Sequence, residues 1–467
     1  MFSYPDRGSQ EGGERSDLPL ASCIQALLEC RIIIRKPLPH AEVAGSQGKA
    51  LLLAYSGGLD SHVLLHSLWQ LRELYPSLSI KAVHVHHGLS ANADFWLAHC
   101  SRICNQLQID FVAKRVNSKP KPGESIEAWA RKARYNILES LLSKNDILLT
   151  AHTQNDQAET LLLQLLRGAG PKGLASMAYQ QSFGNGHHFR PFLNLTRQEL
   201  KKYALHYQLS WIEDDSNTDL RFDRNFLRHQ ILPLLQQRWP AAVENIARSA
   251  GHCAEAASLL NELAQIDLEN NQPQDQLDLA ILRKLKPTRQ RNLLRYWFDL
   301  RKCGQPNSAK LYRIQEEMIC GRVDSQPQIS WGQWILRRFK DRLRLIQATA
   351  LNELPIIPWD LSTPLLLPGN LGQLVACKNQ KGGLSTHLDP QKISIRFRRG
   401  GERCQLTYKN HAALKKLFQQ WQTPQWERGQ IPLLYYNEDL AAVIGYCVCA
   451  PFAANKEELG WTIQQLK

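Results

Sequence analysis

A short glycine-containing segment at positions 56–61, Ser-Gly-Gly-Leu-Asp-Ser, constrains the fold of this chain most strongly. It directly follows the apolar run 50–55, which is typical of a buried strand. Beyond it, apolar residues recur at helical spacing: Val63, Leu64, Leu68 and Leu71. The sequence therefore predicts a strand–loop–helix unit. Its adjacent glycines let backbone N–H groups turn toward an anion at the helix N-terminus.

The front half of the chain alternates between strand and helix patterns. The expected strands cover 51–55, 80–86, 111–116 and 146–151, and the expected helices cover 61–74, 93–108, 125–142 and 156–167. This βαβ order predicts an α/β fold with a doubly wound, mostly parallel sheet, which binds its ligands at the C-terminal ends of the strands. From about Pro240 the pattern becomes helical, and a small α+β domain follows a proline-rich stretch.

These patterns divide the 467 residues into five parts. We expect a disordered extension (1–19), a catalytic domain (20–240), a helical basic domain (241–352), a linker (353–368) and a C-terminal α+β domain (369–467). Residues 1–19 are polar with both charge signs and do not form a secretory signal. No apolar stretch approaches the roughly 20 residues that span a bilayer. With eleven scattered cysteines, the chain is expected in the cytoplasm, away from membranes.

The net charge of +14 is concentrated in the back half of the chain. Residues 283–344 hold sixteen Lys and Arg against five Asp and Glu, a net charge of +11. Residues 391–428 hold nine against two, a net charge of +7, so the rest of the chain is slightly acidic. This division indicates a nucleotide-handling front half and a back half that binds a polyanion, most plausibly nucleic acid. Solvated basic helix faces are the alternative.

Two acidic residues stand at the start of the expected helix 156–167. Leu161, Leu162, Leu165 and Leu166 form its buried stripe, which leaves Asp156 and Glu159 together on the outward face. An acidic helix start is common for electrostatic reasons alone. Beside a phosphate-binding loop, however, the pair indicates part of an active site.

Arginines in two further segments complete the candidate site. Arg131 and Arg134 share a helix face with Glu127, which permits either an ordinary ion pair or stabilisation of phosphate charge. A charged stretch around 211–229 carries Arg224 and Arg228 and would be costly to bury without partners. His84 lies at the end of the second expected strand without the acidic or thiol neighbours of a metal site, so packing or nucleoside contact is expected.

The loop lacks the Gly-Lys-Ser/Thr ending of a Walker loop and resembles the PP-loop of N-type ATP pyrophosphatases. The order of motifs resembles the tRNA(Ile)-lysidine synthetase family in its long, three-domain form. The front-half motifs are those at 56–61, 84–89 (His-Val-His-His-Gly-Leu), 130–135 (Ala-Arg-Lys-Ala-Arg-Tyr), 151–160 (Ala-His-x-x-x-Asp-Gln-Ala-Glu-Thr), 167–170 (Arg-Gly-x-Gly), 214–217 (Asp-Asp-Ser-Asn) and 223–228 (Asp-Arg-Asn-Phe-Leu-Arg). The tail motifs are Arg-Arg-Gly-Gly-Glu (398–402), Leu-Lys-Lys-Leu (414–417) and Pro-x-Trp-Glu-Arg (424–428).

The resemblance implies that ATP, L-lysine and the CAU-anticodon isoleucine tRNA react to give lysidine at the wobble cytidine, AMP and pyrophosphate. ATP would be bound by Ser56, Gly57, Gly58, Leu59, Asp60, Ser61, His84, Arg131 and Arg134. Asp60, Asp156 and Arg224 would be catalytic, with Mg²⁺ on Asp60 and Asp156 and lysine on Asp156 and Glu159. The tRNA would be bound by Arg398, Arg399, Lys415, Lys416 and Arg428. The oligomeric state, monomer or homodimer, stays open.

The chain departs from the family pattern at two positions. Many members carry a second aspartate where this chain has Asn155 and a second histidine where it has Thr153. Three alternative functions fit the motifs less well. A tRNA thiolase would need cysteines beside the loop, and a small-molecule ligase like GMP or NAD synthetase would not need the basic back half. An inactive RNA-binding scaffold is supported only by Asn155.

Overall fold

The computed structural model describes residues 50–123, 125–268, 276–322, 325, 327–348, 354–369, 371–407, 410–455 and 458–466. The expected extension 1–19 lies outside these residues. The chain divides into two compact units, residues 1–261 and 262–467. Within the described ranges, no helix combines the length and apolar character required for a membrane span.

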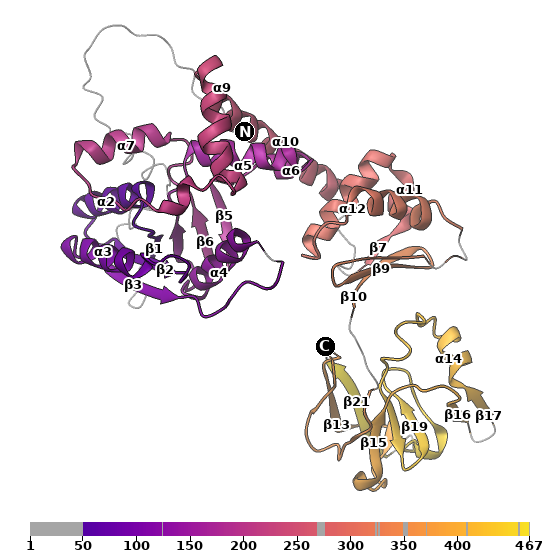
Figure 1. Ribbon diagram of the computed structural model, residues 1–467. Coiled ribbons are helices and arrows are strands. Elements are labelled where there is room, and N and C mark those ends of the chain that lie inside the picture. The colour runs from indigo at the N-terminus through magenta and orange to yellow at the C-terminus, as the bar shows by residue number, and fades with distance from the viewer. Residues whose placement is uncertain are drawn as a thin grey trace, which may run out of the picture. The chain divides into compact units, whose positions relative to one another are not determined.

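The first unit is built on the predicted α/β alternation (Figure 1). Its strands are β1 (Ala50–Ala54), β2 (Ser79–His86), β3 (Asp110–Arg115), β4 (Ile147–Leu149), β5 (Gln180–Phe183) and β6 (Gly186–Phe189). Its helices are α2 (Leu59–Leu74), α3 (Ala93–Gln106), α4 (Ile126–Ser140), α5 (Gln154–Leu166), α6 (Pro171–Leu174), α7 (Arg197–His206), α8 (Asp223–Phe226), α9 (Leu232–Arg238) and α10 (Ala242–Asp267), which continues past the unit boundary. A 3₁₀ turn covers Asp215–Thr218, and a π turn, η2, covers Leu227–Ile231.

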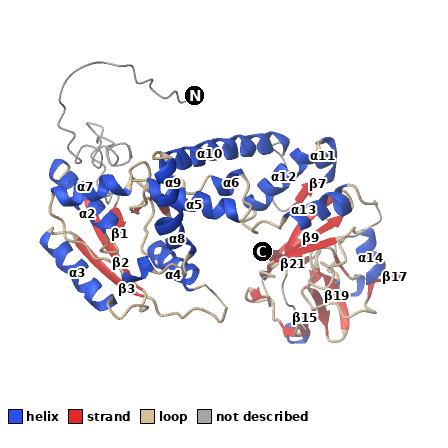
Figure 2. Ribbon diagram, turned by 45° about the horizontal axis from the view of Figure 1, so that its top comes forward, coloured by secondary structure: helices blue, strands red, loops and turns tan. Residues whose placement is uncertain are grey.

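The sheet of this unit has the strand order β3-β2-β1-β4-β6-β5. All pairs are parallel except the edge pair β5–β6. Side chains alternate across the sheet: Leu51 and Leu53 of β1 pack in the cluster that includes α2, α3 and α7, whereas Leu52 packs with α4 on the other face. Helices therefore cover both faces, as seen in Figure 2, which confirms the doubly wound sheet.

The second unit begins with helices, as expected, but it also contains a sheet that the helical pattern did not predict. The helices are α11 (Leu279–Lys284), α12 (Pro287–Leu300), α13 (Ser308–Arg313) and a π turn, η3 (Ile314–Ile319). The antiparallel sheet has the order β7-β10-β9-β8, with β7 (Gln276–Asp278), β8 (Gln328–Trp331), β9 (Trp334–Phe339) and β10 (Arg342–Gln347). Strand β9 carries the adjacent Arg337 and Arg338, and β10 carries Arg342 and Arg344 at alternate positions, so these strands resemble a basic surface segment in sequence. Leu336 and Leu343 nevertheless lie in the core with Trp297.

The C-terminal part consists of small antiparallel sheets and one helix, α14 (Leu414–Gln420). Its strands are β11 (Ile357–Pro358), β12 (Leu365–Leu366), β13 (Gln373–Lys381), β14 (Leu384–Ser385), β15 (Ile393–Arg396), β16 (Arg403–Thr407), β17 (Asn410–Ala413), β18 (Leu433–Tyr436), β19 (Asp439–Val443), β20 (Cys447–Val448) and β21 (Leu459–Leu466). Two 3₁₀ turns cover Pro390–Lys392 and Ala450–Phe452.

The expectation of a linker at 353–368 is wrong for the described residues 354–368. Strand β11 pairs with β15, and β12 pairs with β13. Trp359, Leu361 and Leu367 are buried in the core of the C-terminal part. Prolines commonly mark linkers, but here they border very short edge strands, where a missing N–H costs no ladder hydrogen bond. The stretch is therefore part of the C-terminal domain.

We expect Gly57→Ala to destabilise the first unit by about 2–4 kcal/mol, as measured by urea unfolding. Gly57 has a φ of +85°, and an added Cβ would lie 2.6 Å from Ile212 Cδ1 and 2.8 Å from Cys100 Sγ. Gly58→Ala is the matched control, because Gly58 has a φ of −74° and its Cβ would meet only ordinary contacts at 3.6 Å or more. Equal unfolding free energies for the two variants would contradict this account of the loop.

Candidate active site

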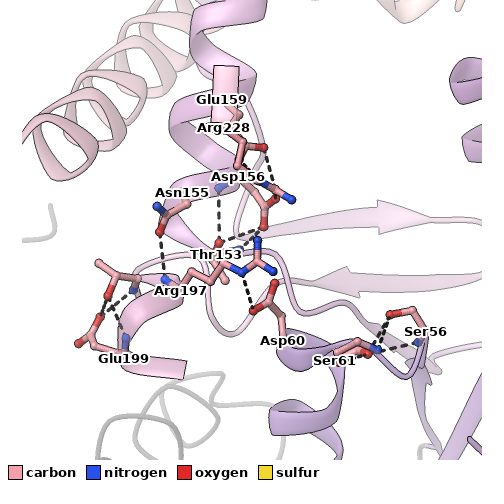
Figure 3. A network of polar contacts seen from close by, with 12 residues as sticks. Ser56, Asp60, Ser61, Thr153, Asn155, Asp156, Glu159, Arg197, Glu199 and Arg228 are labelled. Atoms are coloured by element: carbon pink, nitrogen blue, oxygen red, sulfur yellow. Dashed lines mark hydrogen bonds and ion pairs between the residues drawn. The ribbon is translucent and has the colours of Figure 1, made fainter. Parts of the chain in front are cut away.

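The loop between β1 and α2 is held by its two serines. Ser61 Oγ donates to the Gly58 carbonyl (3.0 Å) and lies 3.0 Å from Ser56 Oγ (Figure 3). The Ser56 amide in turn donates to Ser61 Oγ (3.3 Å). These bonds shape the loop before any ligand binds, and α2 begins directly after it at Leu59. The loop thus lies at the N-terminus of α2, where the helix dipole favours a bound anion.

Four largely buried charges form the centre of the site. From α5, Asp156 and Glu159 face two arginines, Arg224 of α8 and Arg228 of the π turn η2. Arg224 Nε donates to Glu159 Oε2 (2.7 Å), and its Nη2 donates to Asp156 Oδ1 (3.0 Å). Arg228 repeats this arrangement, with Nε on Glu159 Oε1 (2.6 Å) and Nη2 on Asp156 Oδ1 (3.1 Å). We call these four residues the acid–arginine cluster.

The acid–arginine cluster corrects one sequence expectation. Asp156 and Glu159 were expected to face outward, but Glu159 is completely buried and Asp156 is 9% exposed. Burial would raise the pKa of Asp156, but Arg224, His152 and Arg228 outweigh it and hold that pKa below its usual range. The pair still occupies one helix face. The arginines cover this face, and helical periodicity alone did not include them.

The two positions that depart from the family pattern have structural partners. Thr153 is the N-cap of α5: its hydroxyl accepts from the Asp156 amide, and Asp156 Oδ2 accepts from the Thr153 amide (2.8 Å). Asn155 Oδ1 accepts from the backbone N–H of Arg197 (3.0 Å), at the first turn of α7 (Figure 3). The Asn155 side chain therefore binds helix α7, and a carboxamide oxygen is sufficient for this bond.

Asp60 is the loop residue with the most unusual environment. Its Oδ1 is buried without a hydrogen-bond partner among the described residues, and the nearest cation is Arg197, with Nε 4.0 Å away. Burial raises the pKa of Asp60 to about 6, against the opposing effect of Arg197. The acidic pair Asp156 and Glu159 contributes to this rise. Such a perturbed carboxyl at a phosphate-binding loop is typical of a functional group.

The residues fit a magnesium ion in part. Magnesium favours one or two carboxylates together with substrate phosphates. Asp60 supplies a buried oxygen, Oδ1, that has no hydrogen-bond partner among the described residues. Asp156 has both oxygens engaged, by Thr153 on one side and by the two arginines on the other. In the described ranges, no group of three or more His, Cys, Asp or Glu side chains forms a metal site. Asp60 is therefore the better candidate ligand.

Helix α4 and the end of β2 border the same edge of the sheet. Arg131 and Arg134 are exposed on α4, and Arg131 lies over the Tyr135 ring at 5.1 Å. Arg134 is close enough to lower the pKa of His84, although burial is the larger cause. His84 Nδ1 lies 3.0 Å from the Tyr55 carbonyl and donates to it. Strand β2 is thereby held against the start of the phosphate-binding loop.

The basic residues expected to bind tRNA lie in the second unit. Arg399, Lys415 and Lys416 are exposed. Arg398 is half-buried with Nε 3.6 Å from Glu402 Oε2, and Arg428 Nε donates to the Thr423 carbonyl (2.9 Å). The three exposed side chains are thus available to a polyanion, whereas Arg398 and Arg428 also have partners within the protein.

The structure brings together most of the front-half residues that the sequence indicated. Asp156 and Arg224 contact each other directly, and Asp60 lies within electrostatic reach of both Asp156 and Glu159. The sequence analysis did not include Arg197, which follows the capping residue Thr196 of α7. The only signal for Arg197 was its place at the N-terminus of a helix in the capping pattern Thr-x-x-Glu, which does not indicate a binding site.

Three family models match the sequence. They are the PP-loop domain over residues 33–235, the TilS substrate binding domain over 277–344 and the TilS substrate C-terminal domain over 393–465. The chain is 48% identical to the tRNA(Ile)-lysidine synthase of Coxiella burnetii over 414 residues, which cover 88% of this chain and 92% of the relative. It is 45% identical to that of Serratia proteamaculans over 420 residues (89% and 95%). It is 40% identical to that of Legionella pneumophila strain Philadelphia 1 over 436 residues (92% and 99%).

We expect Asp60→Asn to stabilise the protein above pH 6. The pKa of the folded state, about 6, exceeds the ordinary value of 3.8. Between about pH 4 and 6 the folded state therefore retains a proton that the unfolded chain has lost, and stability falls as pH rises. The variant lacks this slope, so its free energy of unfolding at pH 7 should exceed the parent's by up to about 3 kcal/mol.

Urea unfolding between pH 3 and 8 measures this difference, which should vanish near pH 3. Asp110→Asn, at an exposed aspartate of β3, is the control for removal of a surface carboxylate. If Asp60→Asn and the parent show the same stability at pH 7, the Asp60 carboxylate carries no desolvation cost and the argument fails.

Proposed function

The chain belongs to the family of tRNA(Ile)-lysidine synthases, and we propose that it joins L-lysine to C2 of the wobble cytidine of the CAU-anticodon isoleucine tRNA. ATP is converted to AMP and pyrophosphate in the same reaction. The observation that carries this proposal is the acid–arginine cluster beside the phosphate-binding loop, at the C-terminal edge of one parallel sheet. The cluster places two guanidiniums at this edge, each with 22% of its side chain exposed, which can offset the charge that develops in phosphoryl transfer.

The first step adenylates the cytidine. The C2 carbonyl oxygen attacks the α-phosphorus of ATP, an O–P bond forms, and the bond from the α-phosphorus to the pyrophosphate oxygen breaks. The amides of the loop and the serine hydroxyls hold the departing pyrophosphate. Arg224 offsets charge on the phosphate from within the acid–arginine cluster, and the exposed Arg131 and Arg134 do so from α4.

Magnesium, held by Asp60 and the ATP phosphates, would neutralise charge on the triphosphate. Asp60 must be ionised to hold it. At neutral pH, above its pKa of about 6, the carboxylate is mostly charged. The desolvation cost of this carboxylate in the unliganded protein is then offset when a cation binds.

The second step replaces AMP by lysine. The ε-amine attacks C2, a C–N bond forms, and the C2–O bond to AMP breaks; the nitrogen then loses a proton. The amine must be unprotonated when it attacks. Asp156, with 12% of its side chain exposed, is proposed to orient lysine. Glu159 has no exposed surface, so we assign to it the positioning of Arg224 and Arg228.

The tRNA is proposed to bind the basic surface of the second unit. Backbone contacts and shape dominate recognition of structured RNA, so a surface of Lys and Arg fits this partner. Arg399, Lys415 and Lys416 expose their charges, and we assign them phosphate contacts. Cytoplasmic location, where tRNA and ATP are both present, follows from this function.

AMP formation from ATP by the purified chain tests the reaction. We expect AMP release only when both the CAU-anticodon isoleucine tRNA and L-lysine are present, with labelled lysine entering the tRNA. Arg224→Gln should reduce the rate by about 10²-fold or more, because one charge-stabilising group is lost. AMP release without tRNA would instead indicate a small-molecule ligase, and no turnover under any condition would favour an RNA-binding scaffold.

Neutralising Arg398, Arg399 and Lys415 together should weaken tRNA binding and flatten its salt dependence. Each lost phosphate contact should reduce the slope of log K against log salt by up to about 1. Filter binding at several salt concentrations measures both quantities. Neutralising the exposed Lys144, Lys201 and Lys202 of the first unit removes the same charge and is the control. An unchanged slope in the first variant would place the tRNA contact elsewhere.

A further inference from the structure

A chain of buried polar side chains leads from Arg190 to His152. Arg190 Nη2 lies 3.3 Å from His188 Nδ1, and His188 Nε2 lies 2.8 Å from Thr150 Oγ1. Thr150 Oγ1 lies 2.7 Å from His152 Nδ1. Thr150, His188 and Arg190 are all less than 10% exposed. We call these four residues the relay.

The relay stands at the same edge of the sheet as the phosphate-binding loop. Thr150 and His152 directly follow β4, and His188 and Arg190 lie at the end of the neighbouring strand β6. Arg190 is fixed independently: its Nη1 donates to the Ala178 carbonyl (2.6 Å), and its side chain is hydrogen-bonded to Tyr135.

The direction of each hydrogen bond follows from the one member that can only donate. A guanidinium has no acceptor, so His188 Nδ1 must accept from Arg190. In a neutral ring the proton is then on His188 Nε2, which donates to Thr150 Oγ1. The Thr150 hydroxyl has a single proton, which it donates to His152 Nδ1. In the opposite direction, this buried O–H would have no acceptor. His152 Nδ1 is therefore the acceptor, and its proton is on Nε2.

His152 carries that proton into the candidate site. Within the described ranges, no hydrogen-bond partner is found for its Nε2. The charged groups around the ring are Asp156, Arg190, Arg224 and Arg131. Three of these four are cations. An incoming group that accepts a hydrogen bond here would therefore be anionic, such as a phosphate oxygen.

We propose that Arg190, His188 and Thr150 are positioning residues that hold His152 in the Nε2–H form, so that His152 donates a hydrogen bond to a phosphate oxygen of the bound nucleotide. The inference rests on the proposed function for the identity of that nucleotide. His152 is then a neutral donor. It does not accept the lysine proton at Nε2, because Nε2 already carries one.

The charge state of both rings agrees with this assignment. Burial, together with the nearby Arg190, lowers the pKa of His188 to about 3. Burial also lowers the pKa of His152 to about 3, although Asp156 opposes it. Both rings are thus neutral at pH 7, as the direction of the relay requires.

Nitrogen NMR of the full chain with ring-¹⁵N histidine tests the tautomer without reference to activity. The His152 signals are assigned by their loss in His152→Gln. We expect a protonated Nε2 and an unprotonated Nδ1 in the parent and in Thr150→Ser, which retains the hydroxyl. In Thr150→Val, which has nearly the same volume but no hydroxyl, the Nδ1–H form should become populated. A parent with the proton on Nδ1, or a Thr150→Val spectrum identical to the parent's, would overturn the proposal.

Lysidine formation tests the role of the donor. The amide nitrogen of glutamine reaches about as far as Nε2, whereas that of asparagine reaches only as far as Nδ1. We expect His152→Gln to retain kcat within about tenfold and His152→Asn to lose about 10²-fold, the usual effect of removing one donor to a developing charge. Thr150→Val should lower kcat at least about threefold, with Thr150→Ser restoring it. Equal losses in His152→Gln and His152→Asn would overturn the donor role.

The two sets of measurements separate the possible failures. If the parent forms no lysidine but shows the Nε2–H signature, the proposed function fails and the relay stands. If lysidine forms and the signature is absent, the relay fails and the proposed function stands.

Discussion

The acid–arginine cluster is the interaction on which the candidate site depends. It joins α5 to α8 and η2, segments separated by more than 60 residues, through two carboxylates and two guanidiniums in a balanced arrangement. Burying four charges is costly, and the Coulomb attraction offsets that cost only when every oxygen and N–H is well placed. Arg224 and Arg228 are four residues apart on the continuous helical segment of α8 and η2, so they share one face. Removing one member would leave a buried charge without compensation.

Unlike the carboxylates of the acid–arginine cluster, Asp60 in the same site has an oxygen without a hydrogen-bond donor in the described ranges. Its buried Oδ1 has no donor among the described residues, and its pKa is raised, so the unliganded fold bears the desolvation cost of a carboxylate. Such a cost is retained where a ligand later supplies the missing partner. The acid–arginine cluster therefore pairs its own charges, whereas Asp60 has a carboxylate oxygen that a bound cation can pair. The relay adds a third element, a neutral donor whose proton is placed by Arg190, His188 and Thr150.

In the second unit, not every basic residue exposes its charge to a partner. Arg396 lies at a half-buried position of β15, where it is paired with Glu438 (2.7 Å). Arg338 is almost completely buried and donates to the carbonyls of Met318 and Gly321. A count of basic residues therefore overstates the surface that a polyanion meets. The exposed Lys415 and Lys416 are the clearer candidates for such contacts.

Sequence alone establishes the α/β architecture of the first unit, because the strand and helix patterns there are local and the Gly-Gly loop permits the positive φ that the turn between β1 and α2 requires. It also identifies Asp60, Asp156 and Arg224 as chemically significant. Tertiary structure decides which partners these residues meet. No local pattern shows that the outward face of α5 is covered by arginines from residues 224–228, or that residues 357–367 complete a distant sheet. Both depend on contacts between segments far apart in the chain, where burial and charge pairing outweigh local preference.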